Sequence, residues 1–427
     1  MSMNSRHYII LLLVILFSSC GNRSERNRAS ENVQHSTEFV EYDEEFVEDL
    51  SSIVTIPLYT AVSNHNNNLS AIASDIEFVA LSFDPPLPDP FHLWNIELSE
   101  NHIFLSEMRA IYSYDRTGNF IRNIGRVGQG PEGFINISTI QLDRKNQLLY
   151  VADINRQRIL VFRFDGTFER AFPIGGGRIN FVMLDAQTLA WRQTISDRGR
   201  NPAPLIEFTT NNGENIKTLW SNNLPLPPSR GSRGHPDTSP LWSHNNNFYY
   251  MEFGADTIFR ISENSLKPMR VLTGDLKLNF VDHFYINRGR NLRLVTPILR
   301  PNSGIFESNR FLIFRLGSDR EIFFMIYDKK TREFHRTYHR NVPETPRGAR
   351  RMDLFVDDMF SGLTMNPEYQ SMGKAIAVLN AYEIYEQRQE ILDFIENNPS
   401  ERAHQLREIV QNITDDCNPV LAIITFR

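Results

Sequence analysis

Short apolar segments alternate with polar turns over most of the chain. Segments such as "HIFLSE" followed by "AIYSYDRTGNFIRNIG" contain an apolar strand, a polar turn, a second apolar strand and a turn of the Asp-Gly type. Apolar and polar residues that alternate with period two are typical of β-strands, and such turns join strands into hairpins. The pattern therefore predicts an all-β protein.

The strand pairs recur along the sequence. The end of one strand in each unit is marked by a large apolar residue at Tyr114, Phe164, Phe208, Ile261 and Tyr327, which are 44 to 66 residues apart. A period of roughly 50 residues with about four strands per unit is the signature of a β-propeller, in which each blade is one small twisted sheet. From about residue 77 onward the chain has room for six blades.

The last predicted blade is interrupted by a helical segment. Residues 382–413 have apolar side chains at helical spacing, which predicts a helical hairpin before the C-terminal strand "NPVLAIITFR". Asn398-Pro399 is predicted to supply the N-cap and first residue of the second helix. The apolar stripe of the hairpin is expected to pack on the propeller, and a partner-binding helix is the alternative.

A propeller has to close its ring or leave sheet edges open. The early segment "SDIEFVALSFDPPL" is predicted to complete the terminal blade beside the C-terminal strand. We therefore predict a six-bladed β-propeller over residues 51–427, with the helical insertion in its last blade.

The N-terminus has the features of an export signal. The apolar run in "YIILLLVILFSSC" is short for a transmembrane span of ~20 residues and ends in small residues before Cys20. "FSSC" resembles the lipobox of bacterial lipoproteins, which implies cleavage before Cys20 and a lipid on its thiol. A plain signal peptide with an incidental cysteine is the alternative. Residues 1–20 are thus a predicted lipoprotein signal peptide, and the polar residues 21–50 a flexible tether.

Composition and charge narrow the class of partner. With 41% hydrophobic and 22% charged residues the chain has the composition of a folded protein, and a net charge of -6 without a long basic run argues against nucleic acid. If Cys20 is lipidated, Cys417 has no cysteine left to pair with, so no disulfide is expected. Arginines rather than an acidic run follow Cys20, which favours an outer-membrane anchor facing the periplasm over the cell surface.

One segment resembles an NHL repeat, "LYVADINRQRILVFRFDG". The resemblance implies that polar residues and a glycine of this repeat brace turns within the blade. Together with "LFSSC", "GNFIRNIGRVGQGPEGF" and "NPVLAIITFR", it makes the chain similar to the six-bladed β-propeller lipoproteins of Gram-negative anaerobes, whose biochemical role is largely unassigned. The structural residues implied by the repeat are Asp153, Asn155, Arg158, Asp165 and Gly166.

The glycine-rich stretch "GRVGQGPEGF" at residues 125–134 raises the possibility of a phosphate-binding loop. Its first glycines have the Walker spacing, but Pro131 and Glu132 stand where the lysine and hydroxyl are needed, and a strand rather than a helix follows. The stretch is therefore interpreted as a turn between blades. Its polar side chains Arg126, Gln129 and Glu132 are candidate ligand contacts on a propeller face.

A second loop, "RGSRGHPD" at residues 230–237, combines cations and a histidine that could bind a carboxylate or sugar. Its candidate residues are Arg230, Arg233 and His235. A solvated linker is the alternative interpretation of this segment.

The sequence lacks the local motifs of common enzymes and metal sites. It has no nucleophile elbow, zinc-protease motif or EF-hand loop, and His335 and His339 stand ~13 Å apart if they lie on a strand. We expect no cofactor, no metal and no catalytic residue.

The predicted function is a lipid-anchored module of the cell envelope that binds a glycan, a peptide or another envelope protein and does not bind nucleic acid. One alternative is a propeller hydrolase or lyase acting on glycans or peptides, with residues converging at the central channel. The other is a structural subunit of an outer-membrane complex.

Overall fold

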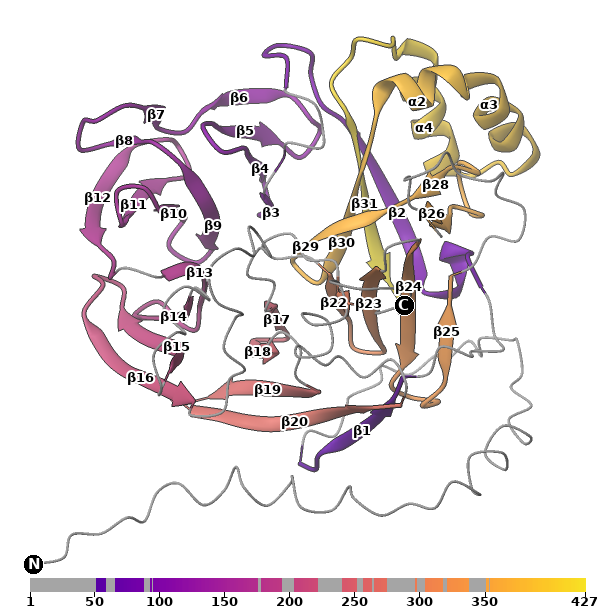
Figure 1. Ribbon diagram of the computed structural model, residues 1–427. Coiled ribbons are helices and arrows are strands. Elements are labelled where there is room, and N and C mark those ends of the chain that lie inside the picture. Colours follow the sequence, from indigo (N-terminus) through magenta and orange to yellow (C-terminus); the bar gives the residue numbers. More distant parts are fainter. Residues whose placement is uncertain are drawn as a thin grey trace, which may run out of the picture. The chain divides into compact units, whose positions relative to one another are not determined.

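Six sheets of the computed structural model form the blades of a β-propeller, which confirms the predicted fold class (Figure 1). All described residues belong to one unit, residues 41–427. The structure describes residues 51–58, 66–87, 93, 95–175, 178–193, 203–221, 240–251, 256–262, 265–274, 296–297, 304–317, 321–337, 351–352 and 354–427.

Blades 1 to 3 are four-stranded antiparallel sheets whose strands follow one another in sequence order. Blade 1 consists of β3 (Asn95–Leu98), β4 (His102–Ser106), β5 (Ile111–Asp115) and β6 (Phe120–Asn123). Blade 2 consists of β9 (Ile137–Asp143), β10 (Leu148–Asp153), β11 (Arg158–Arg163) and β12 (Phe168–Pro173). Blade 3 consists of β13 (Arg178–Met183), β14 (Thr188–Gln193), β15 (Ala203–Thr210) and β16 (Asn215–Ser221).

Blades 4 and 5 contain additional strands. Blade 4 consists of β17 (Leu241–His244), β18 (Asn247–Met251), β19 (Thr257–Ser262) and β20 (Ser265–Thr273), with β1 (Val54–Pro57) parallel to β20. Blade 5 is built on β22 (Ile305–Glu307), β23 (Phe311–Gly317), β24 (Glu321–Asp328) and β25 (Phe334–Arg336). Its short additions are β21 (Thr296–Pro297) on β23 and β26 (Arg351–Met352) on β24.

Blade 6 joins the two ends of the described chain. It consists of β29 (Pro367–Ser371), β30 (Lys374–Leu379), β31 (Val420–Phe426) and β2 (Ala73–Ala80). β2 pairs antiparallel with β31, so that Ile76 lies opposite Ile424, as the sequence predicts for ring closure. Outside the blades, η1 (Leu69–Ala71) precedes β2, and β27 (Phe355–Val356) pairs with β28 (Thr364–Met365).

The sequence repeat coincides with the blades. Tyr114, Phe208, Ile261 and Tyr327 all lie on the third strand of their blade, and Phe164 directly follows the third strand of blade 2. All five side chains are buried. The recurring large apolar residue therefore marks the strand that is packed between the outer strand and the two inner strands of each sheet.

The helical insertion consists of three helices rather than a two-helix hairpin. α2 (Ala381–Glu386), α3 (Arg388–Asn397) and α4 (Glu401–Asn412) lie between β30 and β31 (Figure 1). The predicted cap is wrong: Asn398 is the C-cap residue of α3, and the Ser400 hydroxyl accepts a hydrogen bond from the Ala403 N–H at the start of α4. The hydroxyl satisfies an N–H at the end of the helix that has no partner within the helix itself.

The insertion is fixed to the propeller. Each of its helices buries apolar side chains on one face, and on α4 Arg402 forms an ion pair of 2.7 Å with Asp75 of β2. Ile391, Ile395 and Leu406 are buried and α4 contacts β2, as expected for an apolar stripe that packs on the propeller.

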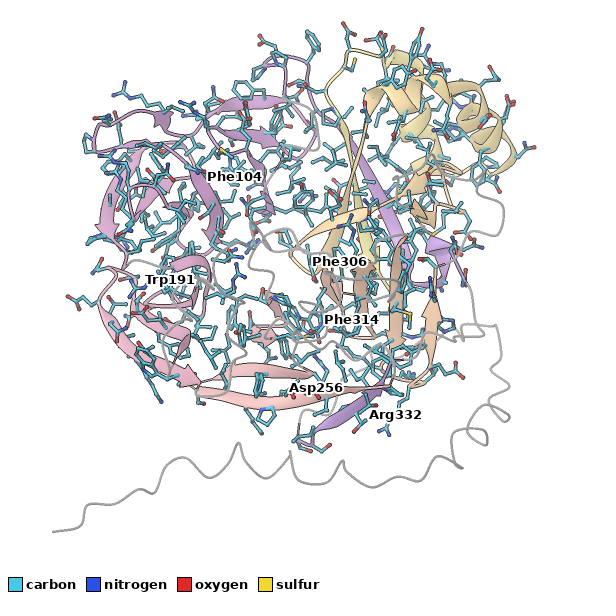
Figure 2. All side chains as sticks on the ribbon, in the orientation of Figure 1. Phe104, Trp191, Asp256, Phe306, Phe314 and Arg332 are labelled. Atoms are coloured by element: carbon cyan, nitrogen blue, oxygen red, sulfur yellow. The ribbon has the colours of Figure 1, made fainter. Side chains whose placement is uncertain are left out.

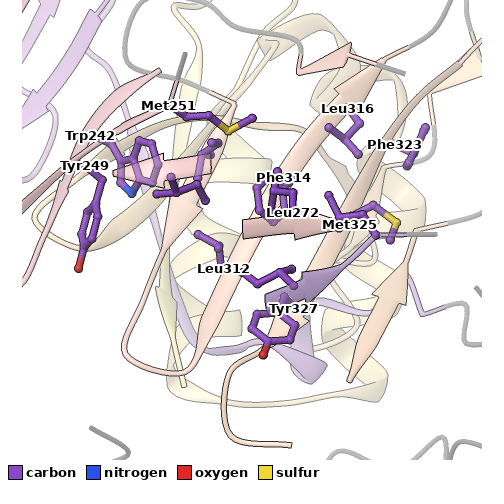
Figure 3. Packing of buried hydrophobic residues seen from close by; sticks show 14 residues of the cluster. Trp242, Tyr249, Met251, Leu272, Leu312, Phe314, Leu316, Phe323, Met325 and Tyr327 are labelled. Atoms are coloured by element: carbon purple, nitrogen blue, oxygen red, sulfur yellow. The ribbon is translucent and has the colours of Figure 1, made fainter. Parts of the chain in front are cut away.

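The hydrophobic core is divided among the spaces between neighbouring blades, which side chains fill (Figure 2). On β10, Leu149 packs in a cluster with blade 1, whereas the next residue, Tyr150, packs in a cluster with blade 3 that includes Trp191. Alternate residues of a strand point to opposite faces, so each middle strand contributes to two cores. The cluster between blades 4 and 5, shown in Figure 3, also contains Ile56 of β1.

We predict that β1 stabilises the fold through this cluster. Ile56 is completely buried, so Ile56→Ala is expected to lower the free energy of unfolding by about 2–5 kcal/mol. Ile53, three residues earlier, is 55% exposed, and Ile53→Ala should change it by no more than about 0.5 kcal/mol. Urea denaturation of both variants checks this, and equal losses would show that β1 contributes nothing specific.

Candidate functional site

The first strand of every blade lies innermost, around the propeller axis. Contacts between β29 and β3, β3 and β9, β9 and β13, β13 and β17, and β17 and β22 run from blade to blade around the ring. Residues on these strands, and on the turns that follow them, therefore line the central channel.

A cavity of about 430 Å³ opens at one end of this channel. This volume lies within the usual range of small-molecule sites, ~300–1,000 Å³. Blades 1, 2, 3, 4 and 6 contribute described residues to it. They are Glu97, Gln141, Arg144, Val182, Leu241, Trp242, Ser243, His244, Asn245, Asn246, Gln370, Ser371, Met372 and Gly373.

Two tight hairpin turns form part of the wall. Asn245-Asn246 joins β17 to β18, and Met372-Gly373 joins β29 to β30. All four residues have positive φ, between 47° and 71°, as in type I′ turns. Asparagine and glycine tolerate this backbone conformation, and the turns therefore fix the positions of the side chains at the rim.

A buried carboxylate and an arginine hold blades 1, 2 and 6 together at the cavity. Arg144 Nη2 lies 2.9 Å from Glu97 Oε2, and the Ser371 hydroxyl donates to the same oxygen at 2.8 Å. Burial raises the pKa of Glu97, and the charge of Arg144 and the hydrogen bond from Ser371 oppose this shift. Burial thus disfavours the ionised form of Glu97, because its charge is largely removed from water.

A second buried carboxylate lies behind the cavity wall. Glu307 of β22 accepts hydrogen bonds from Arg270 at 2.6 Å, Lys329 at 2.8 Å and the Trp242 indole at 2.8 Å. Burial by itself would raise the pKa of Glu307, but the two cations and these hydrogen bonds lower it to about 2. The Gln370 side chain bonds both the N–H and the carbonyl of Glu307, which joins blade 5 to blade 6.

His244 contributes an imidazole to the cavity. Its Nε2 lies 3.1 Å from the Asn309 side-chain oxygen. Burial lowers the pKa of His244, and the nearby Glu307 opposes the shift. The ring is therefore neutral at pH 7, and because Nε2 donates to the Asn309 oxygen, Nδ1 is the acceptor that remains.

The residues predicted from the glycine-rich loop lie at the other end of the propeller. Because successive strands are antiparallel, the turns after first strands share one end, and connections between blades share the opposite end. Arg126, Gln129 and Glu132 belong to such a connection, and none of them lines the cavity. Arg126 and Glu132 form an exposed ion pair of 2.9 Å.

The loop itself is a braced turn, as its sequence indicates. Gly125 has φ of +65°, and a Cβ on Gly133 would lie 2.6 Å from the carbonyl oxygen of Gly128. β7 (Arg126–Val127) and β8 (Gly133–Phe134) form a two-residue parallel ladder within it. Its glycines thus permit a close passage of the chain between blades 1 and 2.

The residues implied by the NHL resemblance lie at turns of blade 2. Asp153 accepts hydrogen bonds from the Ile135 and Asn136 N–H groups, and Arg158 donates to the Gly130 and Gly133 carbonyls. Asn155 accepts a hydrogen bond from Asn136 at 3.4 Å. The Asp165 side chain accepts from the Thr167 N–H at the next turn, where Gly166 has φ of +86°.

The other candidate residues cannot be placed. Cys20, Arg230, Arg233 and His235 lie outside the described residues.

The sequence analysis missed the residues of the cavity. Glu97, Arg144 and Ser371 come from three blades, and none of them belongs to a recognisable motif. They could have been found from their position in the repeat, because the end of the first strand of each blade faces the channel mouth.

Within the described ranges, no group of three His, Cys, Asp or Glu side chains could hold a metal ion. The described cavity lining includes one carboxylate, Glu97, and one histidine, His244.

Comparison with known proteins assigns the family. The model of the family described as "Domain of unknown function (DUF4934)" matches residues 53–425. The chain belongs to the DUF4934 family. The match spans all six blades of this DUF4934 protein, and no curated protein matches it in sequence.

One solved structure shows the same fold, and two others are less similar. A protein of Bacteroides fragilis inferred to be exported has 16% sequence identity and a TM-score of 0.62, with 88% of this chain and 100% of that chain covered. A DUF4221 family member from Bacteroides vulgatus has 10% identity and a TM-score of 0.43, covering 83% and 97%. Virginiamycin B lyase from Staphylococcus aureus has 12% identity and a TM-score of 0.36, covering 65% and 78%. Only the first TM-score exceeds 0.5, and at 16% identity this likeness shows the fold alone.

We predict opposite pH dependences for the two buried glutamates. Glu307→Gln should lower the free energy of unfolding at pH 7 by roughly 3–5 kcal/mol, because it breaks a buried ion pair. The pKa of Glu307 falls from 4.5 to about 2 on folding, so its contribution is present above pH 4.5 and is lost as the pH falls towards 2. Urea denaturation between pH 7 and pH 3 should therefore show the difference between wild type and variant shrinking.

Glu97→Gln is the matched control. The pKa of Glu97 is raised on folding, so its carboxylate weakens the fold increasingly as the pH rises from 4.5 through the raised pKa. The stability of wild type relative to this variant should therefore fall with rising pH, the reverse of the Glu307 series. The same trend in both series would contradict the assignment.

Proposed function

We propose that this DUF4934 protein is a lipid-anchored propeller of the cell envelope that binds a polar glycan or peptide at the channel mouth and does not transform it. The observation that supports this most is the cavity of about 430 Å³ at the ends of the inner strands. Its size and its position where several blades converge are those of a ligand site.

The cavity offers hydrogen-bonding groups that are not used within the fold. Ser243 and Asn246 line it and are exposed, and their side chains make no hydrogen bond to any other described residue. Gln141 makes one long contact, 3.4 Å from its Nε2 to Glu97 Oε1. Hydroxyls and amides that can both donate and accept suit a ligand rich in hydroxyl or amide groups.

The titratable groups of the described lining favour binding over catalysis. A glycosidase-type mechanism needs two carboxyl groups flanking the bond to be cleaved. The described lining supplies Glu97, which already contacts Arg144 and Ser371, and His244, which contacts Asn309. Both groups therefore have structural partners, and no second carboxylate of the described lining is available to act with Glu97.

An envelope location is supported by the sequence and by a related structure. The apolar run before Cys20 has the features of a lipoprotein signal, and the structurally similar Bacteroides fragilis protein is inferred to be exported. None of the helices among the described residues is long and apolar enough to cross a membrane. We propose an outer-membrane anchor through Cys20, facing the periplasm.

The anchor is tested by replacing its cysteine. The full chain, expressed in a Gram-negative host, should fractionate with membranes, whereas Cys20→Ala should appear in the soluble fraction because it cannot carry the acyl chains. Cys417→Ala removes the only other cysteine and should remain with membranes. A Cys20→Ala protein that stays membrane-bound would refute the proposed anchor.

The binding site is tested with the immobilised full chain and a library of glycans and peptides. We expect retained ligands that are recovered chemically unchanged, as mass spectrometry can establish. The double variant Ser243→Ala/Asn246→Gly removes two hydrogen-bonding groups yet keeps a residue suited to positive φ, so it should weaken binding by about tenfold.

Arg126→Gln changes an exposed residue at the opposite end of the propeller and serves as the control. Its affinity should equal that of wild type. Retention of no library member, or a loss seen with Arg126→Gln and not with the double variant, would argue against a site at the channel mouth.

A further inference from the structure

Arg144 is held in one orientation by oxygen atoms of two other blades. Its Nε donates to the Leu98 carbonyl at 2.9 Å, and its Nη2 lies 2.9 Å from both Glu97 Oε2 and the Ser371 hydroxyl oxygen. Leu98 and Glu97 belong to blade 1 and Ser371 to blade 6, whereas Arg144 follows the first strand of blade 2. These contacts fix the plane of the guanidinium before any ligand arrives.

One nitrogen of this guanidinium is left for a ligand. Arg144 lines the cavity with its side chain 39% exposed, and among the described residues Nη1 has no hydrogen-bond partner. A guanidinium has five N–H donors in a plane, which suits the paired oxygens of a carboxylate. A pre-oriented arginine with unused donors in a cavity is an anion-recognition group.

The carboxylate beside Arg144 does not prevent this role. Glu97 Oε2 accepts from Arg144 and Ser371, and Oε1 is approached by Gln141. Its side chain is 10% exposed, whereas that of Arg144 is 39% exposed, so the cation of the pair is the partner presented to the cavity. The described lining contains no other carboxylate that would repel an anion.

The rest of the cavity suits a sugar better than a peptide. On blade 4, the same cavity is lined by Ser243 and Asn246, whose hydroxyl and amide are partners for sugar hydroxyls. Recognition of a peptide relies on pockets for its side chains. Of the apolar side chains in the described lining, Val182, Leu241 and Trp242 are at most 7% exposed and offer little surface to such side chains. Met372, on the rim turn, is 50% exposed, so the apolar surface of the described lining is one side chain at its edge and not a pocket.

We infer that the ligand is an acidic glycan, and that Arg144 Nη1 binds the carboxylate of a hexuronic acid unit while Ser243 and Asn246 bind its hydroxyls. This inference rests on the proposed binding function and names the class of its ligand. The carboxylate gains a charge-assisted hydrogen bond to a guanidinium that is already oriented, so little conformational freedom is lost on binding.

The test uses pairs of probes that differ only in the carboxyl group. Oligosaccharides of galacturonic, glucuronic and mannuronic acid are each compared with their carboxyl-reduced, neutral forms by isothermal titration calorimetry on the full chain. At least one acidic oligosaccharide should bind about tenfold or more tightly than its reduced form, as expected for a hydrogen bond to a charged group.

Substitutions then locate the preference. Arg144→Gln should bring the acidic and reduced probes to within about twofold of each other, whereas Arg126→Gln should keep the wild-type preference. Arg144→Lys keeps the positive charge but replaces the planar guanidinium with an ammonium group, so it should retain part of the preference for the acidic probe. Unchanged thermal unfolding of this variant shows that the fold is intact even if Arg144→Gln is destabilised.

The outcomes separate this inference from the proposed function. Equal binding of acidic and reduced forms, or binding of peptides alone, would overturn the inference and leave a ligand site at the channel mouth. A preference that survives in Arg144→Gln would also overturn it. If neither saccharides nor peptides bind, the proposed function itself fails.

Discussion

The pairing of β2 with β31 is the interaction on which the rest of the propeller depends. A blade of this protein buries both faces of its middle strands, and it can do so only with a neighbour on each side. Blade 6 obtains its outer strand from residues 73–80, and its other strands from residues 367–426. Without that pairing, the cluster that Val79 and Leu421 form with blade 1 would lose its outer strand. Closure therefore converts six sheets that are weak individually into one cooperative core.

Closure of the ring also holds the residues of the channel mouth in place. The inner strands are fixed by the cores behind them, and polar contacts then link one blade to the next. Glu307 and Gln370 join blades 5 and 6, and Arg144 joins blade 2 to blades 1 and 6. The glutamates at these junctions, Glu307 and Glu97, are buried, and a hydrogen bond to a buried group is worth more than one on the surface, whereas a buried group without a partner is costly. The pKa values of the two glutamates shift in opposite directions. Two cations more than offset the burial of Glu307 and lower its pKa, whereas burial outweighs the single arginine beside Glu97 and raises its pKa.

The sequence predicted the architecture far better than the site, and the reason is physical. Strand alternation and the large residue on or directly after each third strand are local and repeated, so they identify the blades without knowledge of contacts. The helical spacing of residues 382–413 and the strand pattern near residue 77 likewise identify the inserted helices and the strand that closes the ring. The helix cap at Ser400 was assigned two residues too early because Asn398 and Ser400 are both good capping residues and only geometry distinguishes them. The cavity residues follow no local pattern, since each blade contributes a few of them. Reasoning from motifs therefore selected Arg126 and its neighbours, which lie at the opposite end of the propeller.

The two ends of the propeller are built for different tasks. At one end, the connection between blades 1 and 2 is braced by Arg158, and the inserted helices follow a second strand, so longer segments are packed down on the fold. At the other end, first strands turn back within two residues at Asn245-Asn246 and Met372-Gly373. Short turns with fixed backbone angles leave the axis open and present side chains that need no reordering when a ligand binds. A pre-organised polar cavity consequently arises where the blades turn most sharply.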